Sequence, residues 1–301
     1  IFSTCKPFKG HFAIIQRNAI TSWTLLRPRP EIILFGDEEG VAEICQELGL
    51  RHIPEVRRAA SGAPFMDDIF SKARVFATHN ILCYINADVI LPSKFMSFVE
   101  TLSHQFKDNF VLICTPYNLY LDKIIDFNIE SWETELYRLM KEKGKEPLLI
   151  GADIFVFPKN CYQQLPPLII GRFCFDSVLI WKAIISGLFV IDATKAICAI
   201  HQDHSNTTHK PSSNQPKSPI IEEEINYNTS ITPWWQKFIY VIDIPYELHP
   251  NGQIVKRWHF PLMRLIFMII VRQIKTFWIQ LLERTLYIRR KFYLYRWWKN
   301  K

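Results

Sequence analysis

The order of hydrophobic and polar positions predicts a chain in which short strands alternate with helices. The first strand candidates are brief apolar runs, at Phe12–Ile15, Glu31–Phe35 and His52–Pro54. The first helix candidates have apolar residues at helical spacing, at Gln16–Trp23 and at Val41–Leu48, the second ended by Gly49. Such alternation is typical of a parallel sheet covered by helices on both faces, whose ligands bind outside the carboxyl ends of the strands.

The same pattern continues to about residue 205. Further strands are predicted at Ile81–Ile85, Phe110–Thr115, Leu148–Pro158, Phe189–Thr194 and Ala196–Ile200. Further helices are predicted at Met66–Thr78, Ser93–Phe106, Ile129–Lys143 and Ser177–Ser186. We therefore expect residues 1–205 to form one α/β domain with a mostly parallel central sheet flanked by helices.

The pattern changes beyond residue 205. Ser205–Pro219 is polar and rich in Pro and Ser, and it is typical of either a linker or a flexible lid. Later in this connecting segment, 206–255, Tyr240–Ile244 predicts an added strand and Tyr246–Gly252 a turn. The segment is thus predicted to connect, or to cover, the domain that precedes it.

The last segment, 256–301, is basic and aromatic; its net charge is +11, whereas the whole chain has +7 and the rest of it therefore −4. It holds twelve Lys or Arg residues and one acid, Glu283, among apolar residues at helical spacing. Such a helix suits an anionic membrane surface, contacted through 261–301, or it packs on the domain with a solvated basic face. Nucleic-acid binding is disfavoured because no recognised module accompanies the basic residues. The longest apolar run, Leu265–Val271, is far shorter than the roughly 20 residues of a membrane span.

Composition narrows the class of protein. Hydrophobic residues make up 49% of the chain and charged residues 22%, as in a folded globular protein. The cysteines form no CxxC pair and several lie in apolar runs, which favours reduced core thiols over a disulfide framework or a zinc site. No signal-peptide pattern opens the sequence, and we expect a cytoplasmic protein that is at most peripheral to a membrane. Because the sequence starts at Ile1 rather than Met, we expect it to be trimmed or to be part of a longer chain.

Candidate chemistry begins at Asp88. The apolar run Ile81–Ile85 leads to this single carboxylate, which suits a hard divalent cation that prefers oxygen ligands. The alternative is that Asp88 only caps the turn or helix that follows. Asp37 follows the strand Glu31–Phe35, and in a parallel sheet it would lie on the same edge as Asp88.

Three further groups of polar residues follow later strands. Asp153 interrupts an apolar strand, and Gly151 beside it allows close approach of a ligand or another backbone. Asp176 lies at the start of a helix, where a carboxylate either acts in chemistry or is merely stabilised by free backbone N–H groups. His201, Asp203 and His204 follow a strand together, and they are candidates for a metal ligand and phosphate contacts.

In this order the motifs resemble those of the GT-A fold nucleotide-diphospho-sugar glycosyltransferases, over about residues 1–205. The motifs are Phe35-Gly36-Asp37, Asn86-Ala87-Asp88, Gly151-Ala152-Asp153, Phe175-Asp176 and Ile200-His201-Gln202-Asp203-His204. The resemblance implies a Rossmann-like fold and a Mn2+ or Mg2+ ion on the diphosphate of the donor. In that family a strand-end DxD motif binds metal and diphosphate; here Asn86 replaces the first Asp and Asp88 keeps the second.

The resemblance also implies roles for single residues. Asp88 and His201 would ligate the metal, and the nucleotide sugar would contact Asp88, Asp37, Asn86 and Gly151. Asp176 resembles the general base of inverting members, and Asp153 would lie near the acceptor or donor sugar as a second catalytic carboxylate. The implied donor is a UDP or GDP sugar, and the implied acceptor is a hydroxyl group on a glycan or a lipid-linked molecule.

Two other functions compete with glycosyl transfer. A sugar-phosphate nucleotidyltransferase shares the sheet architecture, but the Gly-rich phosphate loop that would favour it is missing near Ile1. A non-catalytic protein that binds sugar nucleotides, or a membrane-associated scaffold, is suggested by Asn86 in place of the first Asp. Hydrolysis of a donor in the presence of Mn2+ would separate this last class from the enzymes.

Overall fold

The structure is a computed structural model that describes residues 1–204 and 218–257. The chain divides into two compact units, 1–257 and 258–301, and all described residues belong to the first. The predicted linker or lid between 205 and 217 lies outside the described residues. So does the predicted basic helical extension from 258 onward, together with its expected membrane contact.

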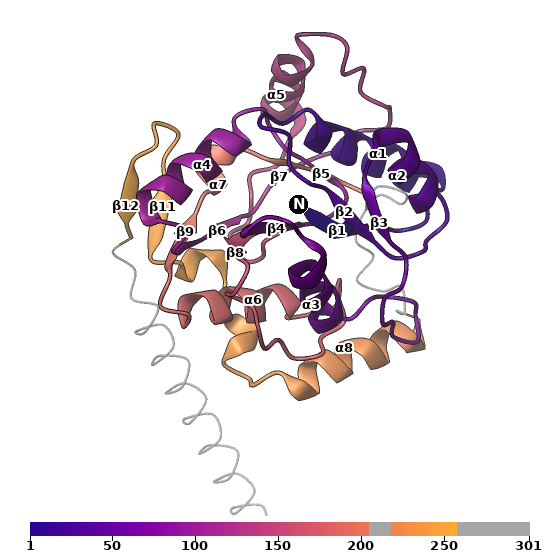
Figure 1. Ribbon diagram of the computed structural model, residues 1–301, viewed down its shortest axis with the longest axis vertical. Helices are drawn as coiled ribbons and strands as arrows, with labels where there is room; N and C mark the ends of the chain where they lie inside the picture. The colour runs from indigo at the N-terminus through magenta and orange to yellow at the C-terminus, as the bar shows by residue number, and fades with distance from the viewer. Residues whose placement is uncertain (205–217, 258–301) are drawn as a thin grey trace, which may run out of the picture. The chain divides into compact units, whose positions relative to one another are not determined.

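A large mixed sheet forms the centre of the first unit (Figure 1). Its strands, in spatial order, are β12 (Ile254–Lys256), β11 (Tyr246–Leu248), β9 (Phe189–Asp192), β6 (Phe110–Cys114), β8 (Ile154–Pro158), β4 (Ile81–Ile85), β1 (Phe2–Thr4), β2 (Ile33–Phe35) and β3 (Arg51–Ile53). Only β8 and β12 run antiparallel to their neighbours in this sheet. The predicted α/β fold with a mostly parallel central sheet is confirmed.

Helices cover both faces of this sheet (Figure 1). One face carries α1 (Gly10–Thr24), α2 (Val41–Leu48), α4 (Phe95–Phe106) and the short α7 (Thr194–Ile197). The other face carries α3 (Met66–Phe76) and α6 (Phe175–Ile184). Two separate clusters of buried apolar side chains result, because strand residues alternate between the faces.

Helix α1 includes residues that the apolar pattern assigned to a strand. Phe12–Ile15 is helical, so that prediction was wrong. Ile15 and Ala19 are buried four residues apart and Trp23 four further on, so they share one buried face of the helix. A run of four apolar residues has no period of its own, so the continuation of the pattern through Trp23 decides for a helix.

A second, three-stranded sheet lies beside the first, in the order β5 (Val89–Ile90), β10 (Ile200–Gln202) and β7 (Tyr117–Leu119). Helix α5 (Trp132–Lys143) packs on it through Leu136. The strand predicted at Ala196–Ile200 was wrong, because α7 occupies its first residues and Cys198 then turns the chain with a φ of 55°. Strand β10 begins only at Ile200 and pairs antiparallel with β5, which brings His201 opposite Val89.

Residues 218–257 extend the same unit. They form α8 (Pro219–Ile231), the 3-10 turns η2 (Gln236–Phe238) and η3 (Val241–Asp243), and the strands β11 and β12. The strand predicted at Tyr240–Ile244 was wrong, because the Asp243 carboxylate accepts a hydrogen bond from the Tyr240 N–H (2.9 Å) and closes a turn. The residues predicted as a turn at Tyr246–Gly252 include β11, which pairs parallel with β9.

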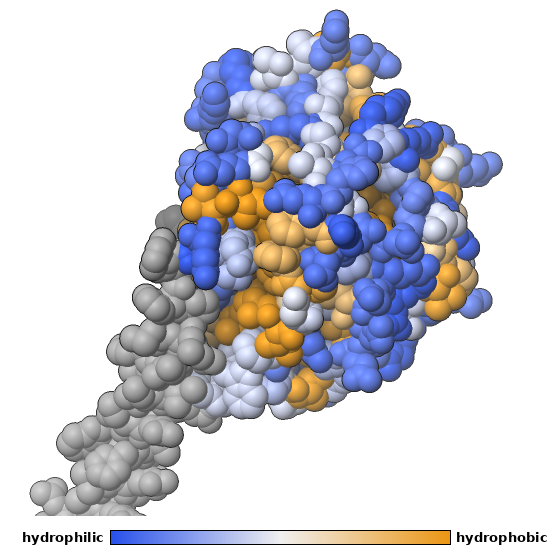
Figure 2. Space-filling view, turned by 60° about the vertical axis from the view of Figure 1, so that its left-hand side comes forward, coloured by the Kyte–Doolittle hydropathy of each residue, from blue (hydrophilic) through white to orange (hydrophobic). Residues whose placement is uncertain are grey.

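The surface of this unit is mixed. Figure 2 shows apolar side chains gathered in the middle and lower part of one face, with polar side chains around them. Within 1–204 and 218–257, no helix combines the length and the apolar character that crossing a membrane requires. All seven cysteines are free, and most are buried.

Candidate metal centre and its surroundings

The candidate residues gather where the parallel strands of the main sheet end. Strands β1, β2 and β4 run in the same direction, so the residues that follow them emerge at one edge. Strand β8 runs the other way, and its first residue, Ile154, pairs with Ile85, the last of β4. Asp153, just before β8, therefore lies at the same edge as Asp88, just after β4.

Asp88, His201 and His204 form a cluster at this edge. His201 Nε2 lies 3.4 Å and His204 Nε2 3.6 Å from Asp88 Oδ2. One ligand atom from each residue lies within 4.8 Å of the others, which is the arrangement that a single metal ion requires. The predicted ligands Asp88 and His201 are thus brought together, and His204 joins them.

Two observations show that the cluster fits a divalent metal. Asp88 Oδ1 is buried and accepts no hydrogen bond from any described residue, although an unsatisfied buried carboxylate oxygen is costly. His201 Nδ1 contacts Asn118 Oδ1 at 2.8 Å, and this contact fits an Nδ1–H donor that leaves the Nε2 lone pair facing Asp88. The donor set therefore offers a carboxylate and two imidazoles to an ion.

Charges within the cluster shift its pKa values. Burial would raise the pKa of Asp88, but the hydrogen bond and charge of His201 and the charge of His204 outweigh burial and lower it. Burial would lower the pKa of His201, yet Asp88 raises it to about 9. Burial lowers the pKa of His204. Without an ion, protonated His201 supplies the positive charge beside Asp88.

Asn86, which occupies the place of the first Asp in the motif, is directed at Asp153. Its Nδ2 donates to Asp153 Oδ1 (2.8 Å), and its Oδ1 accepts from the Tyr84 hydroxyl (3.1 Å). Burial, with the nearby charges of Asp88 and Asp176, raises the pKa of Asp153 to about 7 against the opposing effect of His201. An Asp at position 86 would place a second carboxylate beside that of Asp153, and the two negative charges would repel each other. The Asn86 amide instead donates a hydrogen bond to Asp153.

Asp176 lies in the first turn of α6, as predicted, beside Gly151. A Cβ at Gly151 would come within 2.9 Å of Asp176 Oδ2, so the glycine leaves room for this carboxylate. Burial raises the pKa of Asp176 despite hydrogen bonds from backbone N–H groups. Strand β8 begins at Ile154, so Asp153 precedes the strand and does not interrupt it, contrary to the sequence prediction.

Asp37 lies on the same edge but does not contact the cluster. Its side chain is 71% exposed and its Oδ1 accepts from Arg58 Nη2 at 2.6 Å. The same guanidinium also binds Glu38 and the Gly62 carbonyl. The predicted contact of Asp37 with the nucleotide stays a prediction.

Two cations near the cluster were missed by the sequence analysis. Lys6 follows β1, a strand of three residues that was not predicted, and Arg172 lies in the loop before α6. Although Lys6 has an exposed side chain, its partial burial lowers its pKa, Asp88 opposes that shift, and Arg172 adds to it. Predicting β1 from the apolar Ile1-Phe2 would have placed Lys6 at the same edge as Asp88.

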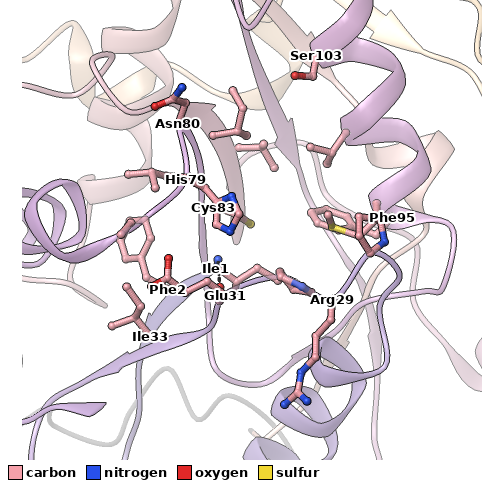
Figure 3. Close-up of a pocket in the computed structure, with 18 of the residues that line it drawn as sticks. Ile1, Phe2, Arg29, Glu31, Ile33, His79, Asn80, Cys83, Phe95 and Ser103 are labelled. Atoms are coloured by element: carbon pink, nitrogen blue, oxygen red, sulfur yellow. Dashed lines mark hydrogen bonds between the residues drawn. The ribbon is translucent and has the colours of Figure 1, made fainter. Parts of the chain in front are cut away.

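A cavity of about 360 Å³ lies at the opposite edge of the sheet (Figure 3). It is lined by residues at the beginnings of β1 and β4, among them Phe2, Asn80 and Cys83, together with Phe95 of α4. None of the candidate site residues lines this cavity. The cavity therefore lies away from the edge where Asp88, Asp153 and His201 come together.

No protein-family model matches the sequence, and no curated protein matches it either. Solved structures do match. S. aureus TarS 1-349 in complex with UDP-GlcNAc is 12% identical, with a TM-score of 0.47 over 76% of this chain and 65% of that one. The mannosyltransferase PcManGT from Pyrobaculum calidifontis, in complex with GDP-Man and Mn2+, is 11% identical, with a TM-score of 0.42 over 67% and 56%.

GalNAc-T7 with UDP, GalNAc and Mn2+ is 13% identical, with a TM-score of 0.48 over 79% of this chain and 49% of that one. The chain thus spans about half to two thirds of these matched structures. At these identities and TM-scores they support no conclusion about this chain's activity.

Proposed function

We propose that the chain is a metal-assisted GT-A glycosyltransferase that moves a sugar from a nucleotide-diphosphate donor to a hydroxyl acceptor. The observation that carries the proposal is the cluster of Asp88, His201 and His204, in which the buried Asp88 Oδ1 has no hydrogen-bond partner among the described residues. Further support comes from its place at the carboxyl edge of a parallel sheet, where such folds bind their ligands. The charges of Asp88 and Asp176 both act on Asp153, so three partly buried carboxylates lie near one another at this edge.

Asp88, His201 and His204 would hold the ion, and Asn118 would keep His201 in the tautomer that ligation needs. A bound Mn2+ or Mg2+ supplies positive charge that offsets the charge developing on the leaving diphosphate. One carboxylate with two imidazoles favours Mn2+ over Mg2+, because Mg2+ prefers oxygen ligands.

Asp176 and Asp153 are the candidates for moving protons. The acceptor hydroxyl loses its proton as it attacks, and a carboxylate of raised pKa is a stronger base than an ordinary one. Asp176 has such a raised pKa and lies next to Gly151, whose lack of a side chain leaves room for the Asp176 carboxylate. We assign Asp176 as the general base. Asp153, which Asn86 holds in place through a hydrogen bond, is assigned as a contact of the sugar.

The proposed partners follow from this chemistry. The donor is a UDP or GDP sugar, contacted by Asp37, Asn86, Asp88 and Gly151. The acceptor is a hydroxyl group of a glycan or a lipid-linked molecule. A peripheral membrane location would suit the second kind of acceptor.

The deciding experiment is calorimetric titration of UDP and GDP into the full chain, with and without Mn2+. We expect one nucleotide to bind in a Mn2+-dependent way, and Asp88→Ala to weaken it at least about 100-fold, because a ligand to the ion is lost. Glu100→Ala removes an exposed carboxylate from α4 and serves as the matched control. If the wild-type chain binds neither nucleotide with Mn2+, the proposal is wrong and a scaffold role gains weight.

A further inference from the structure

Exposed apolar side chains gather on two segments of the first unit. In the loop before β8, Leu148 is 71% exposed and Ile150 is 58% exposed. The second segment runs from the end of α8 through η2 and η3, and it exposes Trp235, Phe238 and Ile242. We call these five residues the apolar patch. Large apolar side chains that are exposed as a group mark a contact surface, whereas single ones are ordinary.

The two segments of the apolar patch touch each other. The Ile242 N–H donates to the Leu149 carbonyl (3.2 Å), so η3 lies directly against the loop before β8. Leu149 packs on the buried apolar cluster that includes Ile239 and Val241. These inward residues hold both segments on the unit, while their neighbours in the sequence stay exposed. The patch is therefore a continuous surface on a fixed backbone.

The charge of the two segments favours a lipid surface as the partner. Residues 147–152 and 225–242 contain no Asp or Glu, and the second stretch contains one cation, Lys237. Aliphatic side chains with Trp and Lys, and without acids, suit the boundary between the head groups and the acyl chains of a bilayer.

The end of the described chain lies beside the patch. Arg257 Nη1 donates to the carbonyl of Val241 in η3 (3.0 Å), and the same guanidinium binds Asp192 and Glu247. These contacts fix the point at which the chain leaves the first unit. The sequence that follows, 258–301, holds ten Lys or Arg residues and one acid. Such a sequence is attracted to anionic head groups, so one chain supplies both charge and apolar surface for a membrane.

We propose that the apolar patch is the surface through which the first unit contacts an anionic lipid bilayer. Gly151 follows Ile150 directly, and a Cβ at Gly151 would come within 2.9 Å of Asp176 Oδ2, so the patch borders the candidate general base. The acceptor hydroxyl then belongs to a molecule held in the lipid layer, and this step rests on the proposed function. The membrane contact itself needs neither donor nor metal.

The first test is sedimentation of the full chain with vesicles of phosphatidylcholine and phosphatidylglycerol. In about 0.5 M NaCl the attraction of the basic residues is screened, and the apolar contribution is measured. We expect Leu148→Gln combined with Ile150→Gln to weaken vesicle binding about tenfold or more, because two exposed apolar side chains no longer enter the lipid. Val75→Gln, which changes an equally exposed side chain of α3, is the matched control and should bind as wild type does.

A second pair of substitutions, Trp235→Gln with Phe238→Gln, tests the other segment of the patch. We expect a loss of vesicle binding of the same order, and circular dichroism shows whether each variant is folded. Equal vesicle binding by wild type and by both folded pairs overturns the inference. So does a wild-type chain that binds no vesicles at any salt concentration.

Hydroxyl-radical footprinting of the unmodified full chain locates the contact without any substitution. We expect Trp235 and Phe238 to be oxidised in the absence of vesicles, and vesicles to lower this oxidation several-fold. Leu25, which is exposed at the end of α1, should be oxidised equally in both cases. Protection of the patch without vesicles would mean that another segment of the chain or a second copy covers it, and this result overturns the inference.

The outcome is independent of the nucleotide titration. Patch-dependent vesicle binding in a chain that binds neither UDP nor GDP overturns the proposed function and leaves the membrane contact standing. Mn2+-dependent nucleotide binding in a chain whose patch is not protected by vesicles overturns the inference and leaves the proposed function standing.

Discussion

The two edges of the central sheet differ in how their polar groups are satisfied. The edge at the strand beginnings holds the cavity of about 360 Å³, and its charges are paired: Glu31 accepts from Thr78 and Arg51. At the edge where the parallel strands end, Asp88 Oδ1 is buried without a hydrogen bond and Lys6 has no carboxylate partner among the described residues.

This difference shows that volume alone is a poor guide to a site. The cavity at the strand beginnings is lined mainly by apolar side chains, and the Glu31 carboxylate there already accepts hydrogen bonds from Thr78 and Arg51. A buried carboxylate oxygen without a donor costs about 1–3 kcal/mol, and a bound cation would repay that cost. The unsatisfied groups, and not the cavity at the strand beginnings, therefore locate the candidate site.

The largest effect we expect at the strand-end edge is on turnover in Asp176→Asn. Removing a general base lowers kcat by about 10²–10⁴-fold while leaving donor affinity unchanged. Glu43→Gln is the control, because Glu43 is also an acid in the first turn of a helix, α2. Steady-state kinetics with donor and acceptor would reveal the difference. Equal, small losses in both variants would mean that Asp176 serves only its helix.

The next effect compares one histidine from each edge. We expect His201→Ala to weaken Mn2+ binding at least about 100-fold, because a ligand is lost from the cluster. His79→Ala, which changes an exposed histidine of the cavity lining, should leave Mn2+ affinity unchanged. Titration of Mn2+ into both variants measures this. Similar Mn2+ affinities of the two variants would show that the two edges of the sheet do not differ in metal binding.

The smallest effect is on stability without metal, and its sign follows from the raised pKa of Asp153. The folded chain keeps a proton on Asp153 up to about pH 7, above the ordinary value of 3.8, so unfolding free energy falls as pH rises through that range. Asp153→Asn keeps an acceptor for Asn86 and removes the charge. We expect the variant to be more stable than wild type by on the order of 1–3 kcal/mol at pH 8.

At pH 4 the same variant and wild type should be nearly equal, because Asp153 is then protonated. Urea unfolding at the two pH values gives the difference. Asp126→Asn, at an exposed loop carboxylate, should show the same small change at both pH values. A stability difference for Asp153→Asn that does not grow with pH would show that burial does not disfavour this charge.

Much of the fold could be predicted from local pattern. Helix α2 has its predicted bounds, because an amphipathic stretch ends at Gly49 in the left-handed conformation. Strands β4, β6 and β9 were predicted because long apolar runs are bounded by polar residues. Strand β1 was not, because three residues with pairing on both sides carry too little pattern of their own.

The candidate site was predicted only in part. Asp88 and His201 were recognisable from position and motif, but the bond from Asn86 to Asp153 depends on β8 running antiparallel between β4 and β6. Strand direction is set by long-range pairing, which no local pattern reveals. The same holds for Arg172, whose orientation depends on Glu224, more than 50 residues later in the chain.

Gln202 lies between two residues of the cluster in sequence and ties its parts together. It is fully buried, and its side chain donates to the Ile15 and Asp88 carbonyls while accepting from Asn18. Its own N–H also donates to the Asp88 carbonyl (3.1 Å), so Asp88 cannot move independently of β10. Mutational tolerance at Gln202 should consequently be as narrow as at the ligands themselves. A residue that need never touch substrate would then look, in any survey of substitutions, like part of the chemistry.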